Sequence, residues 1–347
     1  MTGCNMSSYD PAPSLDNLPI EVGISDDWSS MTKTVYDSAN DIPSGDGFVV
    51  WALCITDPEA SPQPAPEVIF GNAGTKTYAP SWTYSPTRYW QKGTYTFAAA
   101  IPASAFNADF ASTEAGKKGK SNISGTFSEG TLTLNCGSAG YNLADSQDDI
   151  MVAFSNIDNL NSTMGTVVGG VTKKVSFTFE HQLSQVSIAA INVDKNVDIT
   201  VQEVEIYGPH KSTSGSMTFT YNGGVITPSW SYSEQAPGTL YKAFKLAGEQ
   251  GLLSKSAQGS TSTYKPIVSE ILVFPEECTM TVRVKYIATM SGESSNAIYG
   301  SVDIPVDWQS GLNYAYKLRV SSSSITFTSS IQSWDDDTFK DIPHEFN

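Results

Sequence analysis

The feature that most constrains the fold is a two-residue alternation of apolar and polar side chains in short segments along the chain. Residues 279–287 (TMTVRVKYI) show it clearly, and residues 175–180 (VSFTFE) and 312–320 (LNYAYKLRV) repeat it. In the first segment the alternation sets apart four apolar residues, Met280, Val282, Val284 and Tyr286. Because successive side chains of a β-strand point to opposite faces, each segment predicts a strand with one buried face.

Other segments extend this β pattern. Residues 47–56 (GFVVWALCIT) form an apolar run typical of a strand buried on both faces, and residues 94–102, 131–136 and 148–154 predict further short strands. The Gly223-Gly224 pair after Asn222 predicts a hairpin turn. No segment carries a helical apolar stripe longer than about three turns. The sequence therefore predicts an all-β fold of sandwich type.

The length and net charge of the chain limit its domain organisation and the partners it can bind. The 347 residues suit two domains or one large β domain, and the strand pattern restarts near residue 185, which predicts a boundary there. The polar stretches 111–130 and 251–265 predict long surface loops. The net charge of −16, with no basic stripe, argues against a nucleic-acid partner. The sequence has no run of 18 apolar residues, so it predicts no membrane-spanning helix.

The four cysteines are far apart in the sequence. Thr2-Gly3-Cys4 has the form of the end of a bacterial lipoprotein signal, although the charged start and apolar run of such a signal are absent. The alternative is a chance cysteine in a polar terminus. Without a CxxC pair, Cys54, Cys136 and Cys278 do not predict zinc or thioredoxin-like chemistry. If Cys4 carries lipid, one internal disulfide at most is available, and its pairing stays open.

The sequence offers little for catalysis. It lacks the GxSxG, HExxH and P-loop motifs, and His181, His210 and His344 have no metal-ligand spacing. His181 lies in a strand pattern and is interpreted as structural. The acids at 335–337 and 145–149 are either a calcium site or solvated carboxylates, and the missing D-x-D-x-D-G loop favours the second. We expect no enzyme activity, cofactor or metal.

A cluster of aromatic residues, SWTYSPTRYW, admits two interpretations. Trp82, Tyr84, Tyr89 and Trp90 crowd within it. They are either a platform that stacks on sugars or part of the packing of a β-sandwich, and the second is the commoner use of such residues.

Several landmarks together suggest a family. LPIEVGI (18–24), a Thr-Lys step, GDGFVVWA, RYWQKGTYTFAAAIP, DDIMVA, VSFTFEHQLSQVSI, VEIYG, ILVFPE and IPVDWQSGLNYAYKL follow one another in this order. This succession resembles the Bacteroidales fimbrillin family, the subunits of type V pili and their Mfa-like relatives. The resemblance covers roughly residues 4 to 340.

The resemblance implies two tandem transthyretin-like β-sandwich domains. With a lipoprotein tether at 1–17, these are expected at 18–184 and 185–347. It also implies export as a lipoprotein to the outer membrane, with lipid on Cys4, and a place in a fimbrium on the cell surface. Asp37-Ser38-Ala39 resembles a sequence that these bacteria O-glycosylate at Ser38; a plain loop is the alternative.

Assembly is implied as well. A trypsin-like protease is expected to cut after Lys33, the first Lys or Arg in the chain, although many relatives have Arg there. Removal of residues 18–24, with Ile20, Val22 and Ile24 on one face, would open a groove. A strand from another pilin subunit, identical or different, would then fill it.

Three functions follow as hypotheses. The first is a structural or tip pilus subunit assembled by donor-strand exchange and contributing to cell adhesion. The second is a monomeric surface lipoprotein that binds a glycan or host ligand through exposed aromatic residues on the same fold. A secreted hydrolase is disfavoured, because no set of nucleophile, base or metal ligands is visible.

Overall fold

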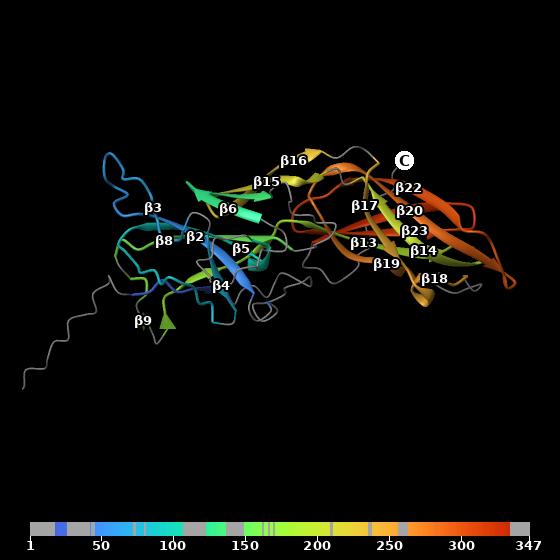
Figure 1. Cartoon of the computed structure of the whole chain (residues 1–347), viewed down its shortest axis with the longest axis horizontal. Helices are drawn as coiled ribbons and strands as arrows, with labels where there is room; N and C mark the ends of the chain where they lie inside the picture. The colour runs from blue at the N-terminus through green and yellow to red at the C-terminus, as the bar shows by residue number, and fades with distance from the viewer. Residues whose placement is uncertain are drawn as a thin grey trace, which may run out of the picture.

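The protein is described by a computed structural model over residues 18–25, 42, 46–71, 74–79, 81–106, 123–136, 149–161, 163–165, 167–168, 171–208, 211–234, 238–255 and 263–333. Within these ranges regular structure consists of β-strands and two 3-10 turns, η3 (Ala103–Ala105) and η4 (Gly248–Gly251). The strands form an elongated molecule, with the first half of the sequence at one end and the second half at the other (Figure 1). The predicted all-β class is confirmed, and the finer assignment to two transthyretin-like domains stays a prediction.

The central sheet of the first half has the order β12-β8-β5-β2-β3, with β4 also paired to β2. Its strands are β2 (Gly47–Ile55), β3 (Glu67–Val68), β4 (Thr75–Tyr78), β5 (Thr94–Ile101), β8 (Met151–Asp158) and β12 (Glu180–His181). In β2, Phe48 and Val50 enter one core, whereas Val49 and Trp51 enter another. All four side chains are at most 1% exposed, which confirms the prediction of a strand buried on both faces.

Different strands pack against the two faces of this central sheet. On one face, β1 (Val22–Ile24) pairs in parallel with β11 (Val175–Phe177) and packs into a cluster that we call the N-terminal core. A second two-stranded sheet pairs β9 (Val167–Val168) with β10 (Val171–Thr172). On the opposite face lies a four-stranded sheet of order β16-β15-β7-β6. Its apolar residues, with those of β2, β5 and β8, form what we call the bridging core.

The four-stranded sheet combines distant parts of the sequence. It contains β6 (Ile123–Ser128), β7 (Thr131–Cys136), β15 (Lys211–Asn222) and β16 (Val225–Glu234). The turn between β15 and β16 consists of Gly223 and Gly224, with φ of 60° and 89°, so the predicted hairpin is confirmed. Strand β15 also pairs with β7. A hairpin from beyond the boundary predicted at residue 185 thus completes a sheet of the first half.

The loop predicted over residues 111–130 is wrong in its last part, where β6 forms a hairpin with β7. The apolar alternation of β6 is interrupted by Gly125, whose ideal Cβ would lie 2.3 Å from Cζ2 of Trp51. The ring of Trp51 therefore fills the place of an inward side chain, which hides the strand pattern. The loop predicted at 251–265 likewise contains a short strand, β18 (Leu252–Leu253).

The second half is built from two further sheets. One has the order β19-β13-β23-β24; the other has the order β17-β14-β20-β21, with β18 and β22 paired to β14 and β20. Their strands are β13 (Ser184–Asn192), β14 (Asp198–Tyr207), β17 (Leu240–Lys245), β19 (Lys265–Val273), β20 (Glu277–Met290), β21 (Glu293–Ser294), β22 (Ile298–Asp307), β23 (Leu312–Val320) and β24 (Ile325–Ser333). Residues 280, 282, 284 and 286 are at most 1% exposed, which confirms the predicted alternation.

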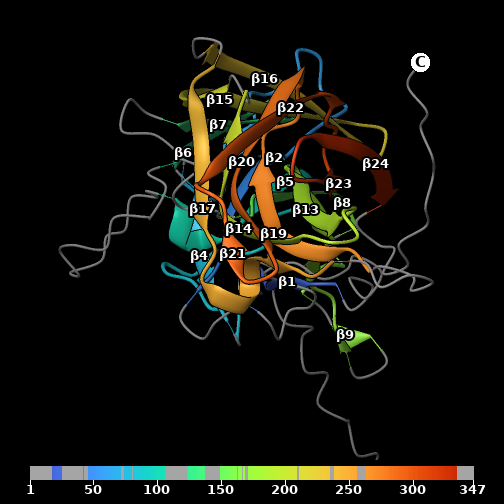
Figure 2. The same ribbon diagram turned by 90° about the vertical axis from the view of Figure 1, so that its right-hand side faces the viewer.

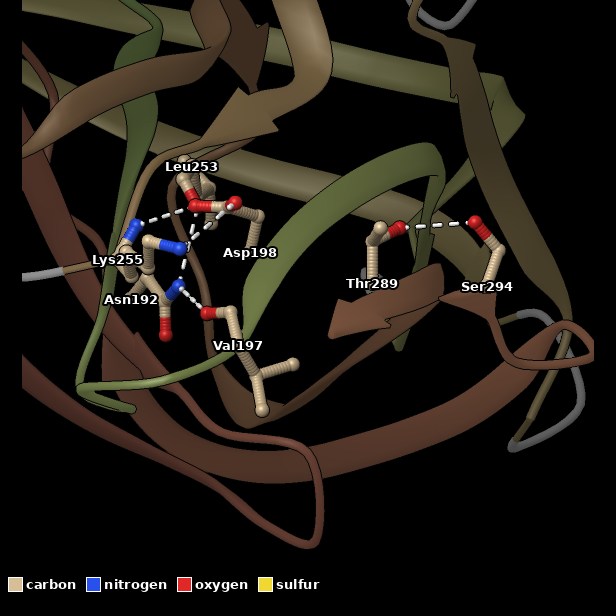
Figure 3. Close-up of polar contacts among 7 residues, drawn as sticks. All are labelled: Asn192, Val197, Asp198, Leu253, Lys255, Thr289 and Ser294. Carbon is tan, nitrogen blue, oxygen red and sulfur yellow. Dashed lines mark hydrogen bonds and ion pairs between the residues drawn. The ribbon is translucent and has the colours of Figure 1, made fainter. Parts of the chain in front are cut away.

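Polar contacts connect the strand ends at the far end of this half (Figure 3). The buried amide of Asn192 donates to the carbonyls of Val197, at 2.7 Å, and Leu253, at 3.1 Å. The backbone N–H of Lys255 donates to Asp198 at 2.8 Å. These bonds connect β13, β14 and β18, and we interpret them as structural.

The two halves are joined by more than the chain itself. Leu183, Leu272 and Phe274 belong to the bridging core, and the ring of Phe274 lies 6.0 Å from that of Trp230 in β16. The backbone N–H of Gly311 donates to the carbonyl of Leu183 at 2.9 Å. The view along the molecule shows β15 and β16 at the top, level with the upper ends of β17 and β22 (Figure 2). The contacts of the hairpin therefore fix the junction.

Candidate functional site

The N-terminal segment, residues 18–25, lies along the edge of β11. Val22 is paired in parallel with Val175, and Ile24 with Phe177. The backbone N–H of Val175 donates to the carbonyl of Glu21 at 2.9 Å, and the N–H of Ser25 donates to the carbonyl of Phe177 at 2.9 Å. The ladder is only three residues long, so the number of backbone bonds on this edge is small.

The opposite edge of the segment meets residues 88–90, which run antiparallel to it. The N–H of Ile20 donates to the carbonyl of Arg88 at 2.8 Å, and the N–H of Trp90 donates to the carbonyl of Leu18 at 2.9 Å. The hydroxyl of Tyr84 donates to the carbonyl of Ile20 at 2.5 Å. The segment thus occupies a groove between two strand-like edges, with hydrogen bonds on both sides.

Side-chain burial also attaches the segment to the fold. Ile20, Val22 and Ile24 are 1%, 5% and 6% exposed and all belong to the N-terminal core. Full burial of an aliphatic side chain contributes about 1.5–3 kcal/mol, so the three together contribute about 5–9 kcal/mol before costs. That the segment is displaced remains a prediction.

A glycine allows close packing at the start of the groove. Gly165 has φ of 75°, and an added Cβ would lie 2.9 Å from Cβ of Leu18 and 2.9 Å from Cδ1 of Trp90. Real Cβ atoms almost never approach so closely, so a larger residue here would displace Leu18 of the segment or Trp90 of the groove.

Several predicted residues lie outside the described part of the chain. These are the predicted lipidation, cleavage and glycosylation positions, Cys4, Lys33 and Ser38, and the acidic stretch 335–337. Lys33 nevertheless follows the segment 18–25 in the sequence. Cleavage there would therefore leave the segment attached to the rest of the protein by non-covalent contacts.

The aromatic cluster is divided by its environment. Trp90 is 1% exposed, the ring of Trp82 lies 5.3 Å from that of Phe48, and Tyr84 lies 5.1 Å from Phe70. These three pack against the N-terminal core. Tyr89 instead is 47% exposed. The packing interpretation therefore holds for three of the four residues.

His181 is buried beside a carboxylate. Its Nδ1 lies 2.7 Å from Oδ2 of Asp149, and the two side chains are 3% and 0% exposed. The pair connects β12 to the residues just before β8, which agrees with the structural interpretation of His181. Among the described residues no three His, Cys, Asp or Glu side chains are arranged to hold a metal ion.

Two cysteines in the described part of the chain have free thiols. Cys54 is a buried free thiol, and Cys278 is a free thiol that is half-buried. Burial raises the pKa of Cys54. None of the helices in the described ranges is long and apolar enough to cross a bilayer.

Sequence reasoning missed the second side of the groove. It identified residues 18–24 as a strand but gave no partner for its other edge. Tyr84, Arg88 and Trp90 supply that partner from an irregular stretch with no alternation. The only available signal was the local density of aromatic residues, which is equally typical of core packing.

Comparisons with known proteins agree with this architecture. A family model described as fimbrillin-like matches residues 32–334. A crystal structure of a fimbrial protein from Bacteroides vulgatus is 15% identical, with a TM-score of 0.56, covering 92% of this chain and all of that one. Two crystal structures of proposed cell adhesion proteins also match. The one from Bacteroides ovatus is 15% identical, with a TM-score of 0.43, and the match covers 91% of this chain and 97% of that one. The one from Parabacteroides distasonis is 9% identical, with a TM-score of 0.45, and the match covers 94% of this chain and 99% of that one. No curated protein matches the chain significantly.

Proposed function

The chain belongs to the fimbrillin-like family, and we propose that it is a non-enzymatic fimbrial subunit at the cell surface that joins other subunits by strand exchange. The observation that carries the proposal is the groove of residues 18–25. It binds an extended segment through hydrogen bonds on both edges and through three buried aliphatic side chains. These are the contacts that an added strand uses when one protein binds another by β-augmentation.

The energetics favour exchange over simple loss. A groove without its strand exposes unpaired backbone groups and an apolar floor. Leaving it empty forfeits about 5–9 kcal/mol of side-chain burial. A strand from another subunit with the same apolar alternation regains that burial and links the two chains, less the cost of association.

The proposed route to assembly uses residues that precede or follow the segment. Lipid on Cys4 attaches the exported chain to the outer membrane, and a trypsin-like protease that accepts lysine cuts after Lys33. The segment 18–25 then has no covalent link to the folded part and is free to be replaced. Ser38, five residues after the cut, is the proposed O-glycosylation site, and adhesion follows from the place of the subunit in the fimbrium.

Limited digestion with trypsin tests the proposal. The purified chain is digested, its new N-terminus is determined by mass spectrometry, and its size is compared before and after. We expect a cut at Lys33, followed by loss of residues up to 33 and by SDS-resistant ladders or filaments.

The matched control is Lys33→Gln, which leaves the groove unchanged and should remain monomeric under the same digestion. Cuts elsewhere with no assembly would contradict the proposal, as would a chain that is cut at Lys33 but stays a monomer that retains residues 18–25. Either result would favour a monomeric surface protein on the same fold.

A further inference from the structure

We propose that the pocket between β3 and residues 87–91 binds one sugar unit of a neutral glycan. The pocket has a volume of about 290 Å³ and is formed by residues 67–69 on one side and 87–91 on the other. None of residues 18–25 lines it, although Arg88 and Trp90 also bond Ile20 and Leu18 through their backbones. It is therefore separate from the strand groove and is present while that groove is occupied.

Two exposed apolar side chains border this pocket, whose accessible lining is otherwise mainly polar. Six large apolar side chains are exposed in the part of the chain that the structure describes, and two of them, Val68 and Tyr89, line this one pocket. Each is 47% exposed. A tyrosine with an exposed ring offers a flat apolar face and a polar tip, which matches the alternating apolar and hydroxylated faces of a sugar ring.

The polar side chains around Tyr89 supply both donors and acceptors. Glu67 offers a carboxylate, Arg88 a guanidinium and Gln91 an amide. The amide of Gln91 donates to Glu67 at 3.3 Å, a long bond that a sugar hydroxyl can replace. Because the charges of Glu67 and Arg88 oppose each other, the pocket favours a neutral ligand over a carboxylate or sulfate.

Size and rigidity fit a small ligand. A volume of about 290 Å³ stands at the lower limit of small-molecule pockets, which suits a single sugar ring rather than a longer chain. The floor is fixed, since Ile69 donates to the carbonyl of Ala52 at 2.9 Å and Trp90 is buried. The pocket thus does not have to be ordered by the ligand, which lowers the entropic cost of binding.

Saturation-transfer NMR on the full chain tests the proposal. The probes are the methyl glycosides of mannose, galactose and N-acetylglucosamine, with the methyl glycoside of N-acetylneuraminic acid as an anionic comparison. We expect saturation transfer to the ring protons of at least one neutral glycoside. Its affinity should fall about tenfold in Tyr89→Ala, because an exposed aromatic anchor is removed.

Two further variants separate the pocket from general effects. Tyr299→Ala removes a tyrosine that is 59% exposed in β22 of the second half, and it should bind as the unchanged chain does. Tyr89→Phe keeps the ring and should retain most of the affinity. The proposal is overturned if no neutral glycoside gives a signal, if only the anionic one does, or if Tyr89→Ala binds as the unchanged chain does.

Discussion

Truncation of Ile20 to alanine tests whether the N-terminal segment opens independently of the rest of the fold. Ile20 is 1% exposed in the N-terminal core. Its N–H donates to the carbonyl of Arg88, and its carbonyl accepts a hydrogen bond from the hydroxyl of Tyr84. An Ile→Ala change at a buried site costs about 2–4 kcal/mol. That is a substantial share of the 5–9 kcal/mol that the three aliphatic side chains contribute together.

Hydrogen exchange of the amides that face the segment measures this cost locally. The N–H groups of Trp90 and Val175 donate to residues 18 and 21, so they exchange when the segment leaves the groove. If the segment opens independently, Ile20→Ala accelerates their exchange by about 30- to 900-fold, the rate equivalent of 2–4 kcal/mol. In the unchanged chain these two amides should already exchange faster than those of β20, which lie in the core of the second half.

The matched control is Ile304→Ala, the same truncation at a residue of β22 that is 0% exposed in the core of the second half. It should accelerate exchange in β20 but leave Trp90 and Val175 unchanged. If Ile304→Ala accelerates the amides of Trp90 and Val175 together with those of β20, the segment opens only with global unfolding. In that case the reasoning that it is exchangeable is wrong.

Three further predictions concern the surroundings of the groove and the sheet. Tyr84→Phe removes the hydroxyl that donates to Ile20, and it should lower the free energy of unfolding by about 0.5–1.5 kcal/mol, measured by urea denaturation. Gly47→Ala places a Cβ 1.8 Å from the carbonyl oxygen of Thr77, so the strands must separate, and a loss of about 1–3 kcal/mol should appear as a lower melting temperature. Cys54 should resist iodoacetamide at pH 8 until the chain is unfolded, because burial both shields the thiol and raises its pKa. Peptide mapping of the labelled protein measures this, and rapid labelling of the native protein would contradict it.

The sequence predicts most strands because their burial follows a simple period. In β20 one face is buried and the other is partly exposed, and β23 follows the same pattern except at the buried Ala315, so alternation identifies both strands. Strand β2 has both faces buried and is recognised by its unbroken apolar run. Strand β6 fails both tests, because the ring of Trp51 takes the place of a side chain at Gly125. Local pattern does not reveal a space that a distant residue fills.

The sequence also did not reveal which strands pair with each other when they lie far apart in the chain. The hairpin of β15 and β16 is visible from its Gly-Gly turn, but its pairing with β7 depends on strands more than 70 residues apart in the sequence. The candidate site shows the same limit. The alternation of residues 18–24 indicated an added strand, whereas the bonds from Arg88 and Tyr84 come from a stretch without any period.

The unequal contributions of backbone and side chains in the groove determine what is able to replace its strand. Strand β1 pairs with β11 over three residues, whereas β20 pairs with β22 over ten. Parallel pairs are also slightly less stable per residue than antiparallel ones. The backbone therefore contributes little discrimination between the native segment and another extended chain. The pockets of Ile20, Val22 and Ile24 contribute most of it, so a replacing strand must present aliphatic side chains at three alternate positions. A single charged side chain at the middle position would be buried without a partner, and that cost exceeds what the backbone bonds return.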